Sequence, residues 1–496
     1  LICTEPTLGS SNNSSEKYEG LAPTPVIQLD AGFYEGSQKT KIDFDENFYK
    51  VRYTTNGNEP DENSSLYIAN TDILIQSTTS LKAKAFPIDN NNLLPSKIDF
   101  KTFFIDESFT VPVFSVAADK IQDLANGQGE LRPIGTLEYF NEDGERTAVS
   151  YGELNRHGQD SWILPHRSLD WISRDEMGYN KAVFEELFTY SDRDEYQRFM
   201  FRASGDDNYP ANGDLNHEGS CHIRDEFVHT LAQKGGMKLD VRAVERVVVF
   251  LNGEYWGLYG LRERPADHDY TVEYYDQDKY NLHYLATWGN TWAEYGGAEA
   301  FADWTDFRDF VLNNDMSIEE NYEIVKSRFQ VKSLCDYMII NLNTVASDWL
   351  NYNTGWWRGI DPKGDHKKWG YILWDNDATF DYYINYSGVP NTDPDAQPCD
   401  IDEISEYMDD FFNNQDVGKH EKIFLKLQEE NDEFRQLYYS RQADLLNTVF
   451  SCDNMIATFD SMIATIEPEM PRQIARWGGY MEGWQENVDK MRGFIT

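Results

Sequence analysis

The segment 347–380, SDWLNYNTGWWRGIDPKGDHKKWGYILWDNDATF, decides the fold of the larger part of the chain. Its centre is an apolar run that leads into Asp361–Asp365, where Pro and Gly predict a turn. The apolar residues Trp369–Trp374 follow and predict a strand that returns beside the first run. The segment therefore predicts a β-hairpin with polar residues at both of its ends.

Four of these polar residues are candidates for chemistry. Asp348 and Asn353 precede the hairpin with four residues between them, and Asp375 and Asp377 follow it directly. Protein kinases place a catalytic Asp, an Asn five residues later, a hairpin and a metal-binding Asp in the same order. That order suits phosphoryl transfer, because a hard dication needs oxygen ligands and neutralises the phosphate charge. The alternative is a coincidental spacing, with Asp375 and Asp377 merely ending a strand.

The sequence around this segment predicts a mixed α and β domain. Val247–Leu261, VVVFLNGEYWGLYGL, reads as two apolar strands around the turn residues Asn252 and Gly253, which predicts a second hairpin. Apolar residues at helical spacing predict three helical blocks. These blocks are Asn321–Asn341, His420–Val449 and Cys452 to the C-terminus. We therefore expect one α+β domain over residues 110–496.

A separate all-β domain is predicted over residues 23–107. Its short alternating runs are typical of strands separated by polar turns. The runs are 26–29, 42–44, 51–53, 73–75 and 81–85. Asn56 and Gly57 predict a tight hairpin turn with positive φ angles.

Both parts of the chain resemble known families. The pattern AGFYEG…VRYTTNGNEPDENSSLY…ILIQSTTSLKAKAF resembles the small chitobiase C-terminal-like β-sandwich, which accompanies secreted bacterial enzymes and implies an accessory module. The stretches FLNGEYWGLYGLRER, SDWLNYNTGWWR, ILWDNDATF and IEPEMPRQIARWGG look like the spore coat protein H (CotH) kinase-like family. That resemblance covers residues 110–496. It implies an atypical protein-kinase-like fold.

The CotH resemblance also implies an activity. It implies ATP with Mg²⁺ or Mn²⁺ as cofactors, and Ser/Thr phosphorylation of an extracellular or envelope protein. Carried over by position, Asp348 is the expected catalytic base and Asn353 an expected metal ligand. Asp375 is the expected main metal carboxylate, with Asp377 as the competing candidate.

The nucleotide side of the resemblance shows one departure. The family's phosphate-binding lysine follows an HGxxSxxxPxK-like stretch, which here reads HGQDSWILPHR and places Arg167 at that position. Arginine can clamp phosphate oxygens in a bidentate manner, but it is not equivalent to a point charge. Glu263 lies where the chain would meet the adenine, and a surface salt bridge is its alternative role. The scattered Gly205, Gly213 and Gly219 form no GxGxxG run.

Composition limits the partners. The chain has 44 Lys and Arg against 86 Asp and Glu, a formal net charge of −42. Such a surface repels phosphate backbones, so we expect no nucleic-acid partner, while a basic protein partner would suit it. No apolar run approaches the roughly 20 residues that a membrane span needs, so we expect no transmembrane span.

The N-terminus suggests an extracellular or cell-surface location. Residues 1–22 predict a flexible tether, because the polar stretch SSNNSSEKYEG lies in it. Cys3 is a candidate lipid-anchored cysteine of an outer-membrane lipoprotein, and the alternative is an unpaired cysteine at a frayed end. The four internal cysteines, Cys221, Cys335, Cys399 and Cys452, could form two disulfides or remain thiols.

Three alternatives compete with the kinase interpretation. The first is a catalytically degenerate kinase fold that acts as a binding or structural component of a bacterial cell-surface complex, which Arg167 favours. The second is glycoside hydrolysis by a carboxylate pair, although nothing in the linear order selects such a pair. The third is a calcium site around Asp206, Asp207, Asn208 and Asp214, for which we expect instead a solvated acidic loop.

Overall fold

The computed structural model describes residues 18–88, 92–175, 178–210, 219–265, 267–346, 349–350, 352–380, 382 and 418–496. These residues form two compact units. The first unit comprises the chain up to 156 together with 169–185 and 246–259. The second comprises 157–168, 186–245 and 260–496.

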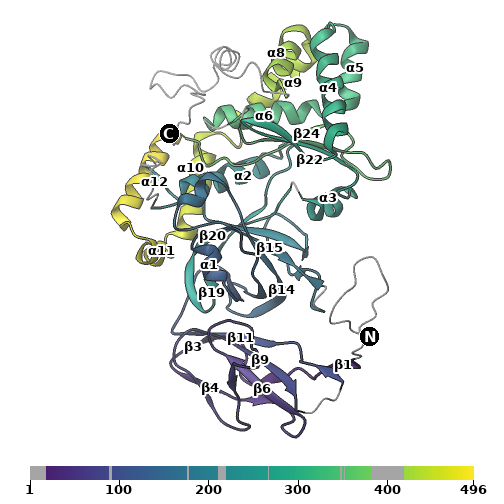
Figure 1. Ribbon diagram of the computed structural model, residues 1–496. Helices are drawn as coiled ribbons and strands as arrows, with labels where there is room; N and C mark the ends of the chain where they lie inside the picture. Colours follow the sequence, from purple (N-terminus) through teal and green to yellow (C-terminus); the bar gives the residue numbers. More distant parts are fainter. Residues whose placement is uncertain are drawn as a thin grey trace. The chain divides into compact units, whose positions relative to one another are not determined.

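The N-terminal part of the first unit is a β-rich region in two layers (Figure 1). One layer is a five-stranded sheet in the order β3-β11-β9-β6-β7, and the other consists of the pairs β2-β5 and β4-β8. Apolar side chains from both layers, among them Ile27, Ile73, Leu81 and Phe103, form one buried core. The strands are β1 (Gly20–Leu21), β2 (Val26–Ile27), β3 (Gly32–Tyr34), β4 (Gln38–Thr40), β5 (Ile42–Asp43), β6 (Tyr49–Thr54), β7 (Ser65–Leu66), β8 (Ile73–Ile75), β9 (Thr79–Pro87), β10 (Leu93–Leu94) and β11 (Asp99–Ile105).

The remainder of the first unit continues directly from this region. Strand β12 pairs antiparallel with β13 and parallel with β19, while β14 pairs with β13 and β15. The runs 113–118 and 247–251 are mainly apolar and buried, which suits strands that are covered on both faces, whereas 146–156 contains several polar and partly exposed residues. The elements are β12 (Val113–Ala118), α1 (Ile121–Ala125), β13 (Ile134–Phe140), β14 (Arg146–Arg156), β15 (Leu169–Ser173) and β16 (Val183–Phe184). Two further strands, β19 (Val244–Leu251) and β20 (Glu254–Arg262), belong partly to the first unit and partly to the second.

Buried contacts join the two parts of the first unit. The Thr102 hydroxyl on β11 lies 2.7 Å from the Ser115 hydroxyl on β12, and it donates to Glu138 Oε2 on β13 at 2.5 Å. The Phe104 ring lies 5.1 Å from the Phe140 ring and 4.9 Å from the Phe250 ring, centroid to centroid. Buried aromatic pairs of this kind add packing energy beyond their area, so the two parts share one aromatic core.

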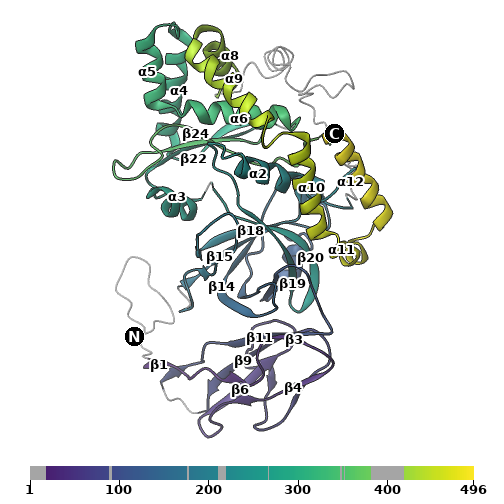
Figure 2. The same ribbon diagram turned by 180° about the vertical axis from the view of Figure 1, so that it is seen from behind.

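The second unit contains a four-stranded sheet in the order β22-β21-β23-β24. The helices α4, α5, α6, α8 and α9 lie on one side of this sheet and α3 on the other (Figures 1 and 2). The strands of this unit are β17 (Glu195–Tyr196), β18 (Arg198–Arg202), β21 (Leu282–Trp288), β22 (Asn290–Tyr295), β23 (Thr354–Gly359) and β24 (Gly370–Ile372). The helices are α2 (Arg224–Lys234), α3 (His268–Tyr275), α4 (Gly297–Asn313), α5 (Glu319–Arg328), α6 (Val331–Asn343), α8 (His420–Glu430), α9 (Asp432–Leu446), α10 (Cys452–Ile466), α11 (Met470–Trp477) and α12 (Met481–Ile495).

Large aromatic residues fix the helices to this sheet. Trp304 of α4 contacts Trp356 of β23 at 5.4 Å between ring centroids, and Tyr337 of α6 stacks on Tyr371 of β24 at 4.4 Å. All four side chains are buried. The sheet therefore presents its other face to α3, where Trp357 packs against Tyr275.

The main elements predicted from the sequence are present, with differences in detail. The α+β class and both long hairpins are confirmed, and Asn252 and Gly253 both have positive φ angles, 54° and 80°. The helical block 321–341 is two helices, because the chain is extended at Phe329, where it pairs with Trp369. The blocks 420–449 and 452–496 are likewise divided into two and three helices.

The tight turn predicted at Asn56 and Gly57 was wrong. Gly57 has a positive φ of 78° but Asn56 does not, and the connection from β6 to β7 spans residues 55–64. A β-carbon on Gly57 would lie 2.3 Å from Oδ1 of Asn252. The glycine therefore serves close packing against the other Asn-Gly turn rather than a two-residue hairpin.

The described residues include three of the five cysteines and the helices named above. Cys221, Cys335 and Cys452 are free thiols, the first two buried and the third exposed, which excludes two disulfides among the four internal cysteines. Cys3 and Cys399 lie outside the described residues. No helix in the described ranges is long and apolar enough to cross a membrane.

Candidate functional site

The β23–β24 hairpin places two of the predicted ligands at one edge of the sheet. Gly355 is paired with Ile372 in antiparallel register, so the start of β23 adjoins the end of β24. Asn353 directly precedes β23, and Asp375 follows β24 three residues after Ile372. Asp348, the predicted catalytic base, lies outside the described residues. The hairpin thus brings the Asn and the Asp of the predicted site to the same sheet edge.

One arginine joins the two candidate metal carboxylates. Nη2 of Arg202, at the end of β18, bonds to Oδ1 of Asp375 and lies 2.7 Å from Oδ2 of Asp377. The side chains of Arg202 and Asp377 are 5% and 6% exposed, and that of Asp375 is 29% exposed. Both carboxylates therefore converge on one buried cation, and Asp375 is the one that solvent reaches.

A third carboxylate, Asp225 of α2, also contacts this arginine. Asp225 Oδ2 lies 3.4 Å from Nε of Arg202 and 2.5 Å from Nη2 of Arg262. The other oxygen of Asp225 accepts the backbone N–H of Asn376 at 2.5 Å. Because Asn376 stands between Asp375 and Asp377, Asp225 ties the first turn of α2 to the loop that carries both candidate ligands.

The charges in this cluster shift the pKa values in opposite directions. Burial alone would raise the pKa of Asp225, but Arg262 and Arg202 outweigh it and hold that pKa well below its ordinary value. Burial and the neighbouring Asp375 raise the pKa of Asp377 well above its ordinary value, more than Arg202 lowers it. The two carboxyls therefore differ in the sign of their pKa shift, although both contact Arg202.

The backbone around the sheet edge is strained. Asp375 has a φ of 61° and Asn353 a φ of 47°, both in the left-handed region that non-glycine residues rarely adopt. Val345, Leu350 and Phe380 are further positive-φ residues within this stretch. Strained backbone persists where surrounding structure enforces it, and it is concentrated at functional sites. Two of the candidate ligands, Asn353 and Asp375, are thus among the described residues with left-handed backbone.

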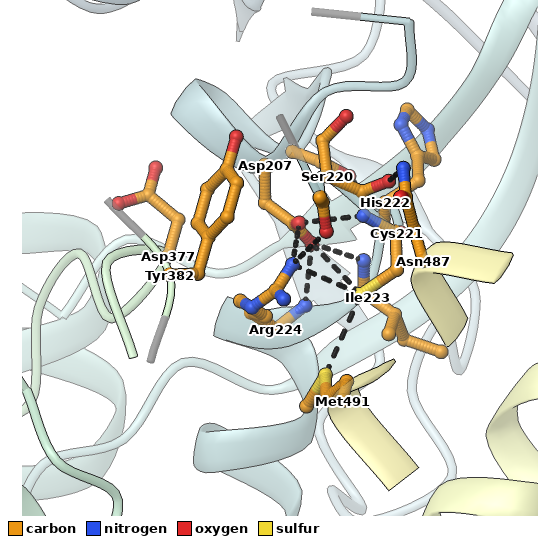
Figure 3. Close-up of polar contacts among 12 residues, drawn as sticks. Asp207, Ser220, Cys221, His222, Ile223, Arg224, Asp377, Tyr382, Asn487 and Met491 are labelled. Carbon is orange, nitrogen blue, oxygen red and sulfur yellow. Dashed lines mark hydrogen bonds and ion pairs between the residues drawn. The ribbon is translucent and has the colours of Figure 1, made fainter. Parts of the chain in front are cut away.

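The residues around Asp207 form a buried anchor and not a solvated acidic loop, so that expectation was wrong. The Asp207 carboxylate accepts backbone N–H groups from Cys221, Ile223 and Arg224 at 2.8, 2.7 and 2.8 Å (Figure 3). It also bonds to the guanidinium of Arg224, the first residue of α2. A carboxylate at this place satisfies amides at a helix start, which have no partner within the helix. Asp207 is fully buried and fixes the N-terminus of α2, while Asp214 lies outside the described residues.

The donor set at the sheet edge is compatible with magnesium. It offers carboxylate oxygens from Asp375 and Asp377 and an amide oxygen from Asn353, which is 4% exposed. No group of three or more His, Cys, Asp or Glu in the described ranges is arranged to hold a metal ion. Mg²⁺ in phosphotransferases is typically held by one or two carboxylates with phosphates and waters, rather than by a complete protein cage. These residues therefore fit a metal ion that binds together with a phosphorylated ligand.

Two known family models match the chain. The family model described as CotH kinase protein matches residues 156–496, more than half of the chain. The chain belongs to the CotH kinase protein family. The model described as chitobiase/beta-hexosaminidase C-terminal domain matches residues 29–94. A search of curated proteins found no match.

In this CotH family member, Arg167 contacts its own loop. Its Nε donates to the carbonyl oxygen of Trp162 at 2.8 Å, and Nη1 donates to that of Pro165 at 3.2 Å. The guanidinium also lies 5.6 Å from the centroid of the Trp162 ring. The arginine at the expected lysine position is thus bound to backbone oxygens of the HGQDSWILPHR stretch.

Glu263 occupies a different buried network. It forms an ion pair with Arg193 at 3.2 Å and accepts the Tyr274 hydroxyl at 3.0 Å. Burial raises its pKa to about 7, against the opposing effect of Arg193. The structure therefore brings together Asn353, Asp375 and Asp377 of the predicted site, and it gives Glu263 and Arg167 other contacts.

Sequence reasoning missed Arg202, Asp225 and Arg262, which form the buried charge cluster behind Asp375 and Asp377. Each is separated from the 347–380 segment by more than 80 residues, and single charged residues carry no spacing signal. The sequence does contain one indication for Arg262 and Arg202. Each ends an apolar strand, so its charged group is expected to be buried. Such a position requires a counter-charge nearby.

Proposed function

We propose that this CotH family member is a secreted or surface-anchored Ser/Thr protein-kinase-like protein that uses ATP with Mg²⁺ or Mn²⁺. The observation that carries the proposal is the convergence of Asp375 and Asp377 on Arg202, at the sheet edge that also carries Asn353. The order Asp, Asn, hairpin and Asp in the sequence supports a kinase-like arrangement of these parts.

Each residue has a role in the proposed transfer. Asp348 accepts the proton of the substrate hydroxyl as the oxygen attacks the γ-phosphorus and the bond to the β-phosphate oxygen breaks. Asp375 and Asn353 would hold the metal ion, which would neutralise the negative charge that develops on the leaving phosphate. Arg202 keeps Asp375 in place. Asp377, which is bound to the same arginine, offers a further carboxyl oxygen beside Asp375.

The proposed location follows from the N-terminal part of the chain. A protein acting outside the cell would suit the polar tether of residues 1–22, the strongly acidic composition and the chitobiase-like region. A lipid on Cys3 would hold it at the outer membrane, with an extracellular or envelope protein as its partner.

A second candidate function rests on Arg167. Because the guanidinium is bound to the carbonyl oxygens of Trp162 and Pro165, it is engaged within its own loop. A degenerate kinase fold that binds a partner of a cell-surface complex without phosphoryl transfer would be consistent with that arrangement.

Phosphoryl transfer from labelled ATP distinguishes the two functions. We would measure autophosphorylation and transfer to a generic basic substrate with Mg²⁺ or Mn²⁺, comparing wild type with Asp348→Ala. Asp365→Ala, an exposed position in the turn of the same hairpin, is the matched control for loss of one charge. Transfer that is lost in Asp348→Ala and retained in Asp365→Ala would support the kinase. No transfer and no nucleotide binding by calorimetry would support the degenerate scaffold.

A further inference from the structure

A third buried arginine, Arg242, lies next to the Arg202–Asp225–Arg262 cluster. Arg242 is 4% exposed. Its Nε and Nη1 are buried and have no hydrogen-bond partner in the described part of the chain, and none of the described carboxylates pairs with it. Its backbone N–H, in contrast, donates to Nδ1 of His229 at 3.2 Å. The main chain of Arg242 is therefore fixed, while its guanidinium has no bond within the described protein.

The backbone register places Arg242 at the edge of the sheet that carries Asp375. Asp240 forms a parallel bridge with Ile372 of β24, its N–H donates to the Tyr371 carbonyl at 3.0 Å, and its carbonyl accepts the Leu373 N–H at 2.9 Å. The chain from Asp240 thus runs alongside β24 in the same direction. Two residues further along, Arg242 is level with the residues that lead from β24 into Asp375.

The two neighbouring arginines differ from Arg242 in their partners. Arg262 Nη2 lies 2.5 Å from Asp225 and 2.9 Å from Glu226, both buried. Arg202 is bound to Asp225, Asp375 and Asp377. Asp225, Glu226, Asp375 and Asp377 are therefore all bound by these two arginines, and no described carboxylate forms an ion pair with Arg242.

The pKa of Arg242 is consistent with a buried guanidinium that has no paired carboxylate. Burial lowers the pKa of Arg242 to about 10, with Arg202 and Arg262 lowering it and Asp225 and Asp375 raising it. The guanidinium remains protonated at neutral pH, because that value lies well above 7. A buried cation without a counter-ion is costly unless an anion pairs with it.

We propose that Arg242 binds an oxyanion of a polyphosphate ligand beside Asp375. The planar guanidinium matches the geometry of phosphate oxygens and binds them in a bidentate manner. The inference rests on the proposed function, in which that ligand is the phosphoryl donor, and it assigns to Arg242 the phosphate-binding charge that the sequence places at Arg167. The shared chemistry is a chain of phosphates, which could belong to a nucleotide or to inorganic polyphosphate.

Calorimetric titration with three ligands tests the proposal. Inorganic tripolyphosphate, ATP and adenosine are titrated, in the presence of Mg²⁺, into wild type, Arg242→Gln and Arg242→Lys. The dissociation constants for tripolyphosphate and ATP are expected to rise on the order of 10- to 100-fold in Arg242→Gln, as for loss of a charge-assisted hydrogen bond. Arg242→Lys is expected to recover part of the loss, and adenosine binding is expected to stay unchanged.

Thermal melting without ligand separates binding from folding. Since Arg242 has no partner to lose, Arg242→Gln is expected to keep or raise the melting temperature. Arg262→Met serves as the comparison, because it removes the counter-ion of Asp225 and Glu226 and is expected to lower the melting temperature. A folded Arg242→Gln protein that binds tripolyphosphate and ATP as tightly as wild type overturns the proposal, and so does a wild type that binds neither.

The outcomes also distinguish this proposal from the proposed function. Arg242-dependent binding of tripolyphosphate by a protein that transfers no phosphate supports the anion site and contradicts the kinase. Binding of ATP in which Arg242 has no effect, by a protein that does transfer phosphate, overturns the anion site and leaves the kinase standing. Tripolyphosphate bound as tightly as ATP would identify the phosphate chain itself as the recognised group and support the proposal.

Discussion

The Asp207 carboxylate and Arg224 are bonded twice, through the backbone N–H and through the guanidinium of the same arginine. Both side chains are buried. Since Arg224 is the first residue of α2 and Asp225 is the second, this contact fixes the turn from which Asp225 reaches Arg202 and Asn376. The position of the candidate metal loop thus depends on a carboxylate that is not part of it.

Replacement of Asp207 is therefore expected to be strongly destabilising. Asp207→Ala leaves a buried guanidinium and three backbone amides without their acceptor, which should cost about 3–5 kcal/mol of unfolding free energy. Urea unfolding followed by circular dichroism measures the loss. Ser451→Ala, which removes the ordinary N-cap of α10, is the control and should cost about 1 kcal/mol. An equal effect of the two variants would contradict the anchoring role.

Removal of Arg202 should destabilise the protein and change its response to metal. Arg202→Met leaves Asp375, Asp377 and Asp225 without a shared counter-charge, so a loss of about 3–5 kcal/mol is expected. Added Mg²⁺ should then raise the melting temperature more in the variant than in wild type, because the ion replaces the missing positive charge.

The control for Arg202→Met is a substitution of a more exposed arginine. Arg328 is 25% exposed and pairs with Asp306 and Asp303, whose side chains are 76% and 21% exposed, so Arg328→Met should cost about 1 kcal/mol, well below the loss expected for Arg202→Met. It should also leave the response to Mg²⁺ unchanged. If Mg²⁺ stabilised all three proteins equally, Asp375 and Asp377 would not be its ligands.

Two glycines with similar backbone conformations should respond differently to substitution. Gly57 and Gly36 have φ angles of 78° and 65°. An added β-carbon meets Asn252 at 2.3 Å in the first case and nothing within 4 Å in the second. Gly36→Ala should cost about 1 kcal/mol from backbone strain, and Gly57→Ala should cost a further 1–3 kcal/mol from the steric clash. Equal losses of unfolding free energy would show that the Gly57 loop can move away from Asn252.

Lys82 predicts a pH dependence of stability. Its ammonium group is buried and donates to the Ala117 carbonyl at 2.6 Å, and burial lowers its pKa from 10.5 to about 8 despite Glu59, Asp119 and Glu138. Between pH 8 and 10.5 the unfolded chain holds the proton more tightly than the folded chain. Stability from this residue therefore rises with pH through that window, by about 3 kcal/mol.

The Lys82→Met variant isolates this contribution. It should exceed wild type in unfolding free energy at pH 7.5, and the difference should shrink as the pH approaches 10.5. Lys39→Met, with a side chain that is 66% exposed, controls for the change in net charge. A difference between Lys82→Met and wild type that is the same at both pH values would refute the shifted pKa.

How far the sequence predicts this protein depends on how local the information is. The hairpins at 252–253 and 361–365 were predictable, because apolar runs around turn residues are local patterns. The turn at Asn56 and Gly57 was not, since the use of that glycine depends on Asn252, which lies almost 200 residues away. The same pair of residue types therefore has two different roles in one chain.

The candidate site was predictable to a similar extent. Asn353, Asp375 and Asp377 share one hairpin, and their common sheet edge follows from antiparallel pairing. Arg202 and Asp225 come from β18 and α2, and no pattern in their own segments indicates that a carboxylate from residue 375 will meet them. Long-range charge pairing of this kind depends on the complete fold.

The packing of the Phe104 ring limits where the protein can be cut into separately expressed parts. The CotH match begins at residue 156 and the chitobiase-like match ends at residue 94, which suggests two separable pieces. Yet Phe104 covers Phe140 and Phe250, and the Thr102 hydroxyl binds the buried Glu138. A protein that lacks residues 1–110 would expose the rings of Phe140 and Phe250 to water and leave Glu138 without the Thr102 donor. Such a protein should aggregate on expression. Because Thr102 and Phe104 lie between the two matched ranges, a cut made there should cost the first unit part of its shared core.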